Sequence, residues 1–177
     1  MNRERLEEKL RELPLYQYAF FPTEALCFTD KVRTVCREEC PMYNKSWACP
    51  PAVGEVSACR EKCLRYPDCL MISTITEVSD IANLDETLAT RAGHEEMTRQ
   101  VLSLLREETE DTFVLSTEAC AICETCAWPD GPCRHPDKMF PCVESHGILV
   151  TALSERCGID FIAGGNVVTW YSLLFYR

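Results

Sequence analysis

The sequence lacks long apolar runs, and its N-terminus lacks the features of a signal peptide. No segment approaches the roughly 20 consecutive apolar residues that a membrane span needs. The first residues, MNRERLEEKLREL, carry charges where a signal peptide has an apolar core. Long stretches of Gly, Ser or Pro, which mark linkers, are absent as well. We therefore expect a cytoplasmic protein that forms a single domain over residues 1–177 and enters no membrane.

Common catalytic signatures are also missing. The chain has no nucleophile elbow, no glycine-rich phosphate loop, no HExxH zinc motif and no CxxCH haem attachment site. Histidine is scarce, with three residues in all. We interpret His94, beside Glu95 and Glu96, as part of a solvated helix face, and His146, before Gly147, as a turn residue. Neither supports a catalytic role, and whether the protein is an enzyme stays open.

Basic residues are fewer than acidic ones. The chain has 28 acidic and 18 basic residues, which gives a formal net charge of −10. A negative protein is repelled by phosphate backbones and by anionic lipid. We expect no binding to nucleic acid or membranes. An acidic surface suits docking on a basic redox partner protein.

Cysteine, in contrast, is abundant. Thirteen cysteines cannot all pair within one chain, because the number is odd. The cytoplasm keeps thiols reduced, and clustered cysteines there indicate metal binding or catalysis more often than disulfides. The cysteines fall into two groups, one in each half of the chain.

The C-terminal group, CAICETCAWPDGPCRHP, has the spacing of an iron–sulfur site. A CxxCxxC run is typical of ferredoxin-type [4Fe–4S] sites, because three closely spaced thiolates can bind three corners of one cluster. Zinc sites more often use two separated CxxC pairs, although a zinc ion or a group of ordinary buried thiols stays open. Arg134 can offset thiolate charge, and His135 is assigned to a turn. The expected ligands are Cys120, Cys123, Cys126 and Cys133.

The N-terminal group, CREECPMYNKSWACPPAVG, contributes Cys36, Cys40 and Cys49. Prolines after the cysteines fix the direction of the chain, which suits a loop around a cluster. A radical-SAM motif is excluded, since position 43 is Tyr instead of the required cysteine. If only three cysteines bind, one iron keeps an open position for a substrate.

The fourth ligand of the N-terminal group is not fixed by the sequence. We include Cys59 in the expected ligand set. The other nearby cysteines are Cys27, Cys63 and Cys69, whereas Cys142 and Cys157 reach this group only if the chain folds back.

The pattern of elements predicts an α+β or α/β fold with a small sheet of about three or more strands. Strands are expected at 69–78, 112–120 and 166–177, with a short amphipathic helix through Leu6, Leu10 and Leu13 and a long helix from Asn83 to about Glu108. The inward side of the long helix is expected to carry Leu88, Met97, Val101 and Leu104 or Leu105. Residues 27–69 and 120–142 are expected to form embedded metal-binding modules, the first built of loops and turns.

Together, C-x3-C-P-x-Y-x3-W-x-C-P-P and C-x2-C-x2-C-x6-C-R-H-P resemble a family of uncharacterised prokaryotic proteins described as predicted metal-binding proteins. The resemblance covers nearly the whole chain, including GGNVVTWYSLLFY at its end. It implies metal binding by the seven cysteines of the two motifs, with iron–sulfur as the favoured cargo. The family often has Gly where this chain has Asn44, a residue that tolerates a left-handed backbone.

Three functions follow as hypotheses. The first is electron transfer by one or two [4Fe–4S] clusters. The second is an enzyme whose N-terminal cluster has three cysteine ligands and an open iron site. The third is an interaction module stabilised by zinc.

Overall fold

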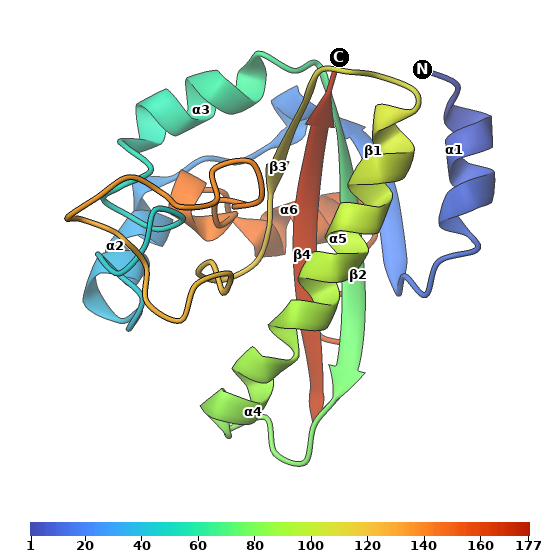
Figure 1. Cartoon of the computed structure of the whole chain (residues 1–177). Helices are drawn as coiled ribbons and strands as arrows, with labels where there is room; N and C mark the ends of the chain where they lie inside the picture. The colour runs from blue at the N-terminus through green and yellow to red at the C-terminus, as the bar shows by residue number, and fades with distance from the viewer.

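A four-stranded antiparallel sheet lies at the centre of the computed structural model, which describes residues 1–177. Its strands stand in the order β1-β2-β4-β3 (Figure 1). The two central strands are the longest, and each pairs over its full length with the other. The strands are β1 (Gln17–Pro22), β2 (Asp68–Glu77), β3 (Thr112–Leu115) and β4 (Val167–Tyr176).

Six α-helices flank this sheet and the loops beside it. They are α1 (Arg3–Leu10), α2 (Asp30–Glu38), α3 (Val56–Leu64), α4 (Leu84–Ala89), α5 (Arg91–Arg106) and α6 (Val150–Cys157). Antiparallel strands with separate helices define an α+β fold, so the predicted fold class is confirmed. Both termini lie at the same end of the sheet (Figure 1).

Alternating side chains on β2 and β4 create two hydrophobic cores, because successive residues of a strand point to opposite faces. Leu70 and Ile72 of β2, with Leu174 of β4, face α1 and α5. There they pack against the buried leucines of these helices, which are Leu6, Leu10, Leu102 and Leu105. Charged side chains also join α1 to the segment just after α5, since Arg5 Nη1 lies 3.6 Å from Glu108 Oε1.

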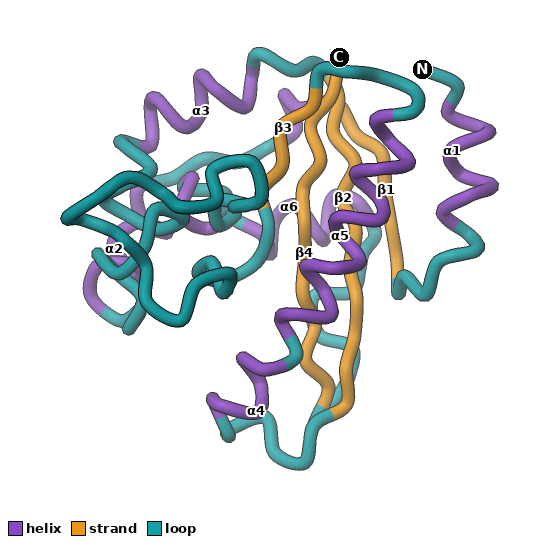
Figure 2. The backbone as a smooth tube through the Cα atoms, viewed as in Figure 1, coloured by secondary structure: helices purple, strands orange, loops and turns teal.

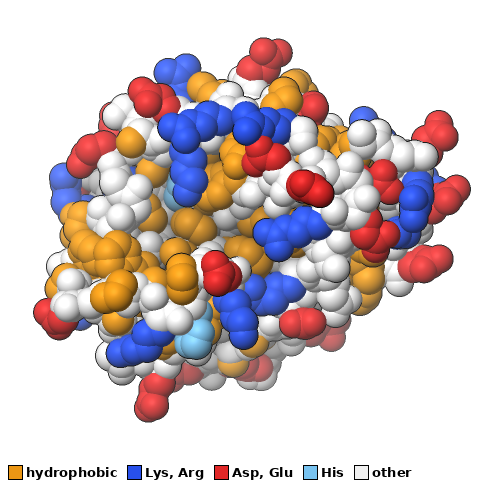
Figure 3. All heavy atoms as spheres, turned by 45° about the horizontal axis from the view of Figure 1, so that its top comes forward, with side chains coloured by type: hydrophobic (Ala, Val, Ile, Leu, Met, Phe, Trp, Pro, Cys, Tyr) orange, Lys and Arg blue, Asp and Glu red, His pale blue; other side chains and the backbone are white.

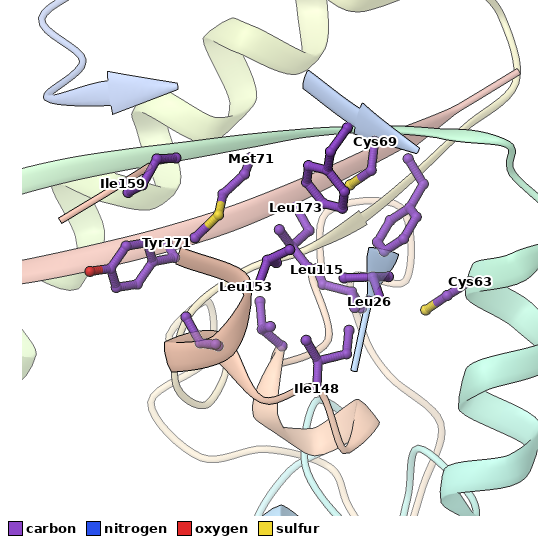
Figure 4. Close-up of a cluster of buried hydrophobic side chains, with 14 residues drawn as sticks. Leu26, Cys63, Cys69, Met71, Leu115, Ile148, Leu153, Ile159, Tyr171 and Leu173 are labelled. Atoms are coloured by element: carbon purple, nitrogen blue, oxygen red, sulfur yellow. The ribbon is translucent and has the colours of Figure 1, made fainter. Parts of the chain in front are cut away.

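The opposite face of the sheet packs against α6 and the segment before it (Figure 4). Met71 and Leu173 lie there beside Ile148 and Leu153. Cys63 and Cys69 are fully buried in this core and pack with apolar side chains. These two thiols therefore serve the packing of the sheet.

Several elements differ from the sequence-based prediction. The predicted strand at 69–78 and the final strand are confirmed, but β1 was not foreseen and the strand at 112 ends at Leu115. The segment 27–69, predicted as loops and turns, contains α2 and α3. The expected long helix is divided at Thr90 into α4 and α5.

The inward face of α5 also differs from the prediction. His94, which we expected on a solvated face, is 2% exposed and lies against the sheet. Its Nε2 lies 2.8 Å from Ser172 Oγ, and its Nδ1 lies 2.8 Å from Thr74 Oγ1. Two hydroxyl partners satisfy the ring, which explains how a polar side chain occupies this position. Met97, predicted to face inward, is only half-buried.

The two cysteine-rich segments lie side by side at one edge of the molecule. They form the mass of loops beside β3, at the left in Figure 2, together with α2. Hydrogen bonds join them, because Trp47 Nε1 donates to Gly131 O at 3.0 Å and Trp128 Nε1 donates to Asn44 Oδ1 at 2.7 Å. The sheet thus holds both cysteine groups at a common edge. None of the helices combines the length and the hydropathy of a membrane span.

Candidate metal centre

The C-terminal cysteine loop closes around a small cavity. All four predicted ligands line this space of about 20 Å³; they are Cys120, Cys123, Cys126 and Cys133. The loop begins just after β3 and is held by its own backbone, since Gly131 N donates to Ala127 O at 2.8 Å. Trp47 and Met139 complete the apolar wall. The structure therefore brings the four cysteines to one place.

Two basic or polar side chains lie at the same cavity. Arg134 Nη1 donates to Thr125 O at 2.8 Å, so its guanidinium bridges the loop. His135 also lines the cavity and is exposed to solvent. A cationic side chain beside thiolates lowers the electrostatic cost of gathering them.

The N-terminal cysteines line a second, larger cavity of about 220 Å³. Cys36 lies in the last part of α2, Cys40 follows the end of this helix, and Cys49 comes from the turn that precedes Pro50. The structure thus brings together the three cysteines of the N-terminal motif. Glu118 and Glu144 also line this cavity, whereas no acidic side chain lines the C-terminal one.

Asn44 fixes the turn between Cys40 and Cys49. Its φ of 57° is left-handed, a conformation that Asn tolerates better than most residues. Asn44 N donates to Pro50 O at 2.8 Å, which closes the turn. The side chain accepts the bond from Trp128. Asn44 therefore serves both the turn and a contact that joins the two loops.

Cys59 lies away from the N-terminal cavity. It is buried on α3, where its Sγ donates to Val53 O at 3.4 Å and lies 3.9 Å from Arg33 Nη2. The structure does not bring it to Cys36, Cys40 and Cys49. Cys142 does line their cavity, although it belongs to neither motif. No pattern in the sequence around Cys142 indicates this, because only the folding of the chain places it there.

Burial makes the N-terminal thiols weak acids. It raises the pKa of Cys36 and of Cys49 to about 11, and the neighbouring cysteines and Glu118 act in the same direction. Burial likewise raises the pKa of Cys120 in the other cavity. A bound cation provides the positive charge that stabilises the thiolates in such a place.

The four cysteines of the C-terminal motif line one cavity, and the three of the N-terminal motif line the other. No three His, Cys, Asp or Glu side chains lie close enough together to hold a single metal ion. Around zinc, with Zn–S bonds of about 2.3 Å, ligand sulfur atoms lie about 3.8 Å apart. A four-iron cluster binds each thiolate at a different iron and so needs them farther apart. Both cavities thus offer cysteine donors, and neither presents three of them as a ready site for a single ion. All thirteen cysteines are free of disulfides.

The two cavities share a wall. Trp47 lines the C-terminal cavity, whereas Cys49, two residues later, lines the N-terminal one. In the same way, Ala119 lines the N-terminal cavity and Cys120 lines the C-terminal one. Consecutive Cα atoms are about 3.8 Å apart, so two short runs of chain separate the spaces.

Basic side chains gather near these loops despite the negative net charge. Lys62 and Arg65 of α3 line a hollow of about 400 Å³ that also contacts Trp47 and Met139 of the C-terminal site. Figure 3 shows Lys and Arg side chains in the middle of the face that carries α3. The hollow lined by Lys62 and Arg65 is therefore basic, whereas the N-terminal cavity contains Glu118 and Glu144.

Comparison with known proteins gives one match. No curated protein and no solved structure is similar enough to match the chain. A family model described as "Predicted metal-binding protein (DUF2284)" matches residues 19–176. This range includes both cysteine groups, strands β2, β3 and β4, and all but the first two residues of β1. The chain therefore belongs to this family of predicted metal-binding proteins, as its motifs suggested.

Proposed function

We propose that the protein carries two cysteine-bound iron–sulfur clusters and transfers electrons between them and a partner protein. The observation that carries this proposal is the pair of cysteine-lined cavities with a common wall. One cavity collects the four cysteines of the C-terminal motif, and the other collects the three of the N-terminal motif. Thiolate donors in such numbers favour clusters.

The protein's own groups position and protect such clusters. Trp47 and Trp128, one from each cysteine loop, meet edge to face with ring centroids 4.7 Å apart and so join the two loops. Each cluster, when bound, takes up and releases single electrons. Short separation across the common wall supports transfer between the two sites.

The charge near the loops suggests which partner docks there. Lys62 and Arg65 line the hollow next to the C-terminal cysteines, and opposite charges across an interface speed encounter. At this face, we propose docking of a redox partner with an acidic surface. Elsewhere the net charge of −10 still suits a basic partner.

Anaerobic analysis of iron and acid-labile sulfide tests the proposal. Wild-type protein should contain iron and sulfide in comparable amounts, and Cys123→Ser should lose about half of both, because one of two clusters loses a ligand. The exposed Cys27 provides a control, since Cys27→Ser should keep the full content. Colourless protein that contains zinc and no sulfide would show the alternative zinc module instead.

A second candidate function is catalysis at the N-terminal cluster. Its cavity of about 220 Å³ is roughly ten times larger than that of the C-terminal loop, and apolar side chains such as Val35 and Met42 line it. If three cysteines alone bind the cluster, the fourth iron is free for a substrate. A change in the cluster spectrum on adding a small anion such as cyanide would support this candidate.

A further inference from the structure

Cys142 reaches the N-terminal cavity from the far half of the chain. Its side chain lines this cavity together with Cys36, Cys40 and Cys49. Cys142 N donates to Ala48 O at 3.0 Å, which places the residue beside Cys49. A parallel bridge also pairs Cys142 with Ser116. The proximity of Cys142 to the motif cysteines therefore arises from backbone contacts.

The surrounding backbone holds Cys142 rigidly. Ser116 N donates to Pro141 O at 2.9 Å, and Val143 N donates to Ser116 O at 2.8 Å. Ser145 Oγ donates to Cys142 O at 2.5 Å. The residue is 7% exposed, and both of its backbone polar groups have partners. A ligand fixed in this way needs little reordering when metal binds.

The thiol itself has only one polar contact. Cys142 Sγ donates to Glu144 Oε2 at 3.0 Å, and Glu144 lines the same cavity. In contrast, the thiol of Cys59 faces Val53 O, outside this cavity. Cys63 and Cys69 are packed in the core of the sheet. Among the six cysteines outside the two motifs, Cys142 alone lines the N-terminal cavity.

We propose that Cys142 is the fourth cysteine ligand of the N-terminal site. The inference rests on the proposed function, because it assigns a residue to a cluster that the function requires. The S–H bond of Cys142 breaks as the S–Fe bond forms, and the proton leaves to solvent. With four thiolates every iron has a protein ligand, so the site relays electrons and binds no substrate at an open iron.

The assignment also connects the two halves of the chain. Cys36, Cys40 and Cys49 precede β2, whereas Cys142 follows the C-terminal cysteine loop. One cluster at this site then bonds covalently to segments about 90 residues apart in the sequence. In the sequence, the four cysteines of the C-terminal site then lie between Cys49 and Cys142 of the N-terminal site.

Substitution at Cys142 tests the proposal, with the buried Cys59 as the matched control. Wild-type, Cys142→Ser and Cys59→Ser chains are reconstituted anaerobically with ferrous iron and sulfide, and iron content and the EPR spectrum of the reduced protein are compared. Cys142→Ser should lose between about a quarter and all of the iron of one cluster, and one of two EPR signals should change. Cys59→Ser should match the wild type.

Each outcome bears on one of the two claims. Wild-type protein without iron and sulfide would contradict the proposed function. Wild-type protein with two clusters, together with Cys142→Ser protein of unchanged iron content and spectrum, would overturn only the assignment of Cys142. Loss of the iron of one cluster from Cys59→Ser protein alone would likewise overturn only the assignment of Cys142.

A second measurement does not depend on how well Cys142→Ser folds. Substitution of selenocysteine for Cys142 keeps the shape of the side chain and supplies a selenolate, which can bind iron as a thiolate does. X-ray absorption at the selenium edge of the reconstituted protein then reports the neighbours of this one atom. An iron neighbour confirms the proposal, and a spectrum without iron overturns it.

Discussion

Asn44 shows how a single residue can serve both a turn and a contact between loops. Its left-handed φ of 57° suits Gly or Asn, and its side chain accepts a bond from Trp128. Asn44→Gly should cost about 1 kcal/mol, because only the hydrogen bond is lost. Asn44→Ala should cost about 2 kcal/mol, since strain of about 1 kcal/mol is added. Thermal unfolding of the wild type and of the two variants in the same metal state checks this order. Equal melting temperatures for Asn44→Gly and Asn44→Ala would contradict it.

His94 makes stability depend on pH. Burial lowers the pKa of His94 to about 4, from an ordinary value of 6.5. In the unfolded chain the imidazole takes up a proton as pH falls below 6.5, whereas the folded protein keeps it neutral. This contribution is therefore fully present above pH 6.5 and is lost as pH falls towards 4. Between pH 7.5 and 5.5 the expected loss is about 1 kcal/mol.

The variant His94→Gln isolates this effect. Gln can bond to the same hydroxyl groups of Thr74 and Ser172 and does not titrate. The difference in unfolding free energy between wild type and variant should shrink by about 1 kcal/mol from pH 7.5 to 5.5. Urea unfolding at the two pH values measures it. A constant difference would show that His94 titrates normally in the fold.

Among the helices, α5 contains an unfavourable residue without a structural reason. Gly93 is exposed, has an ordinary helical backbone, and a Cβ atom there would meet no atom within 4 Å. Gly93→Ala should stabilise the protein by about 0.5–1 kcal/mol, because the unfolded chain loses conformational freedom.

Gly147→Ala is the opposite case. Its φ is +75°, and a Cβ would lie 2.8 Å from Val56 Cγ1, so this variant should be destabilised. Melting temperatures of both variants check the two signs.

The sequence predicted those elements in which apolar residues follow a clear period. The apolar run of β2 and the leucines of α1 were read correctly for this reason. Helix α2 is amphipathic, with Val32, Val35 and Cys36 on the side that lines the N-terminal cavity, but none of its residues is buried. It was missed because the cysteines and prolines of this segment indicated loops. Strand β1 was missed because it is short, half-buried and ends in Pro22. Tertiary contacts decide such elements.

The candidate site was predictable to the extent that it consists of local motifs. The spacing of Cys120, Cys123, Cys126 and Cys133 indicated a common site, and the structure collects them at one cavity. The position of Cys142 was not predictable, since it depends on backbone bonds to Ala48 and Ser116. The prediction for His94 was wrong because the two glutamates that follow it indicated a solvated face. Its side chain instead faces hydroxyl groups of the sheet.

Over the whole molecule, the sheet and the cysteine loops have different sources of stability. The two hydrophobic cores include none of the seven motif cysteines, so the sheet does not need metal to bury its apolar residues. The loops at 36–54 and 116–142 contribute few residues to those cores. Metal removal should therefore loosen the loops and leave the sheet folded.

Limited proteolysis of protein with and without metal tests this division. After chelation under reducing conditions, trypsin should cut within the two loops, at sites such as Lys45 and Arg134, while the sheet keeps its circular dichroism. Arg134 and Lys45 are already exposed in the fold. Protection of these sites from trypsin in the metal-bound protein therefore reports the order of the loops, because burial does not shield them. Global unfolding on chelation would show that the sheet depends on metal after all.

The wall between the two cavities also has an electrical consequence. It consists of Trp47 to Cys49 on one side and Ala119 to Cys120 on the other, so only two short runs of chain separate the two spaces. If both proposed clusters are bound, an electron that arrives at one centre repels a second electron at the other across this thin wall. The pair should consequently fill in two separate steps, with the second step at a lower midpoint potential than an isolated centre would have.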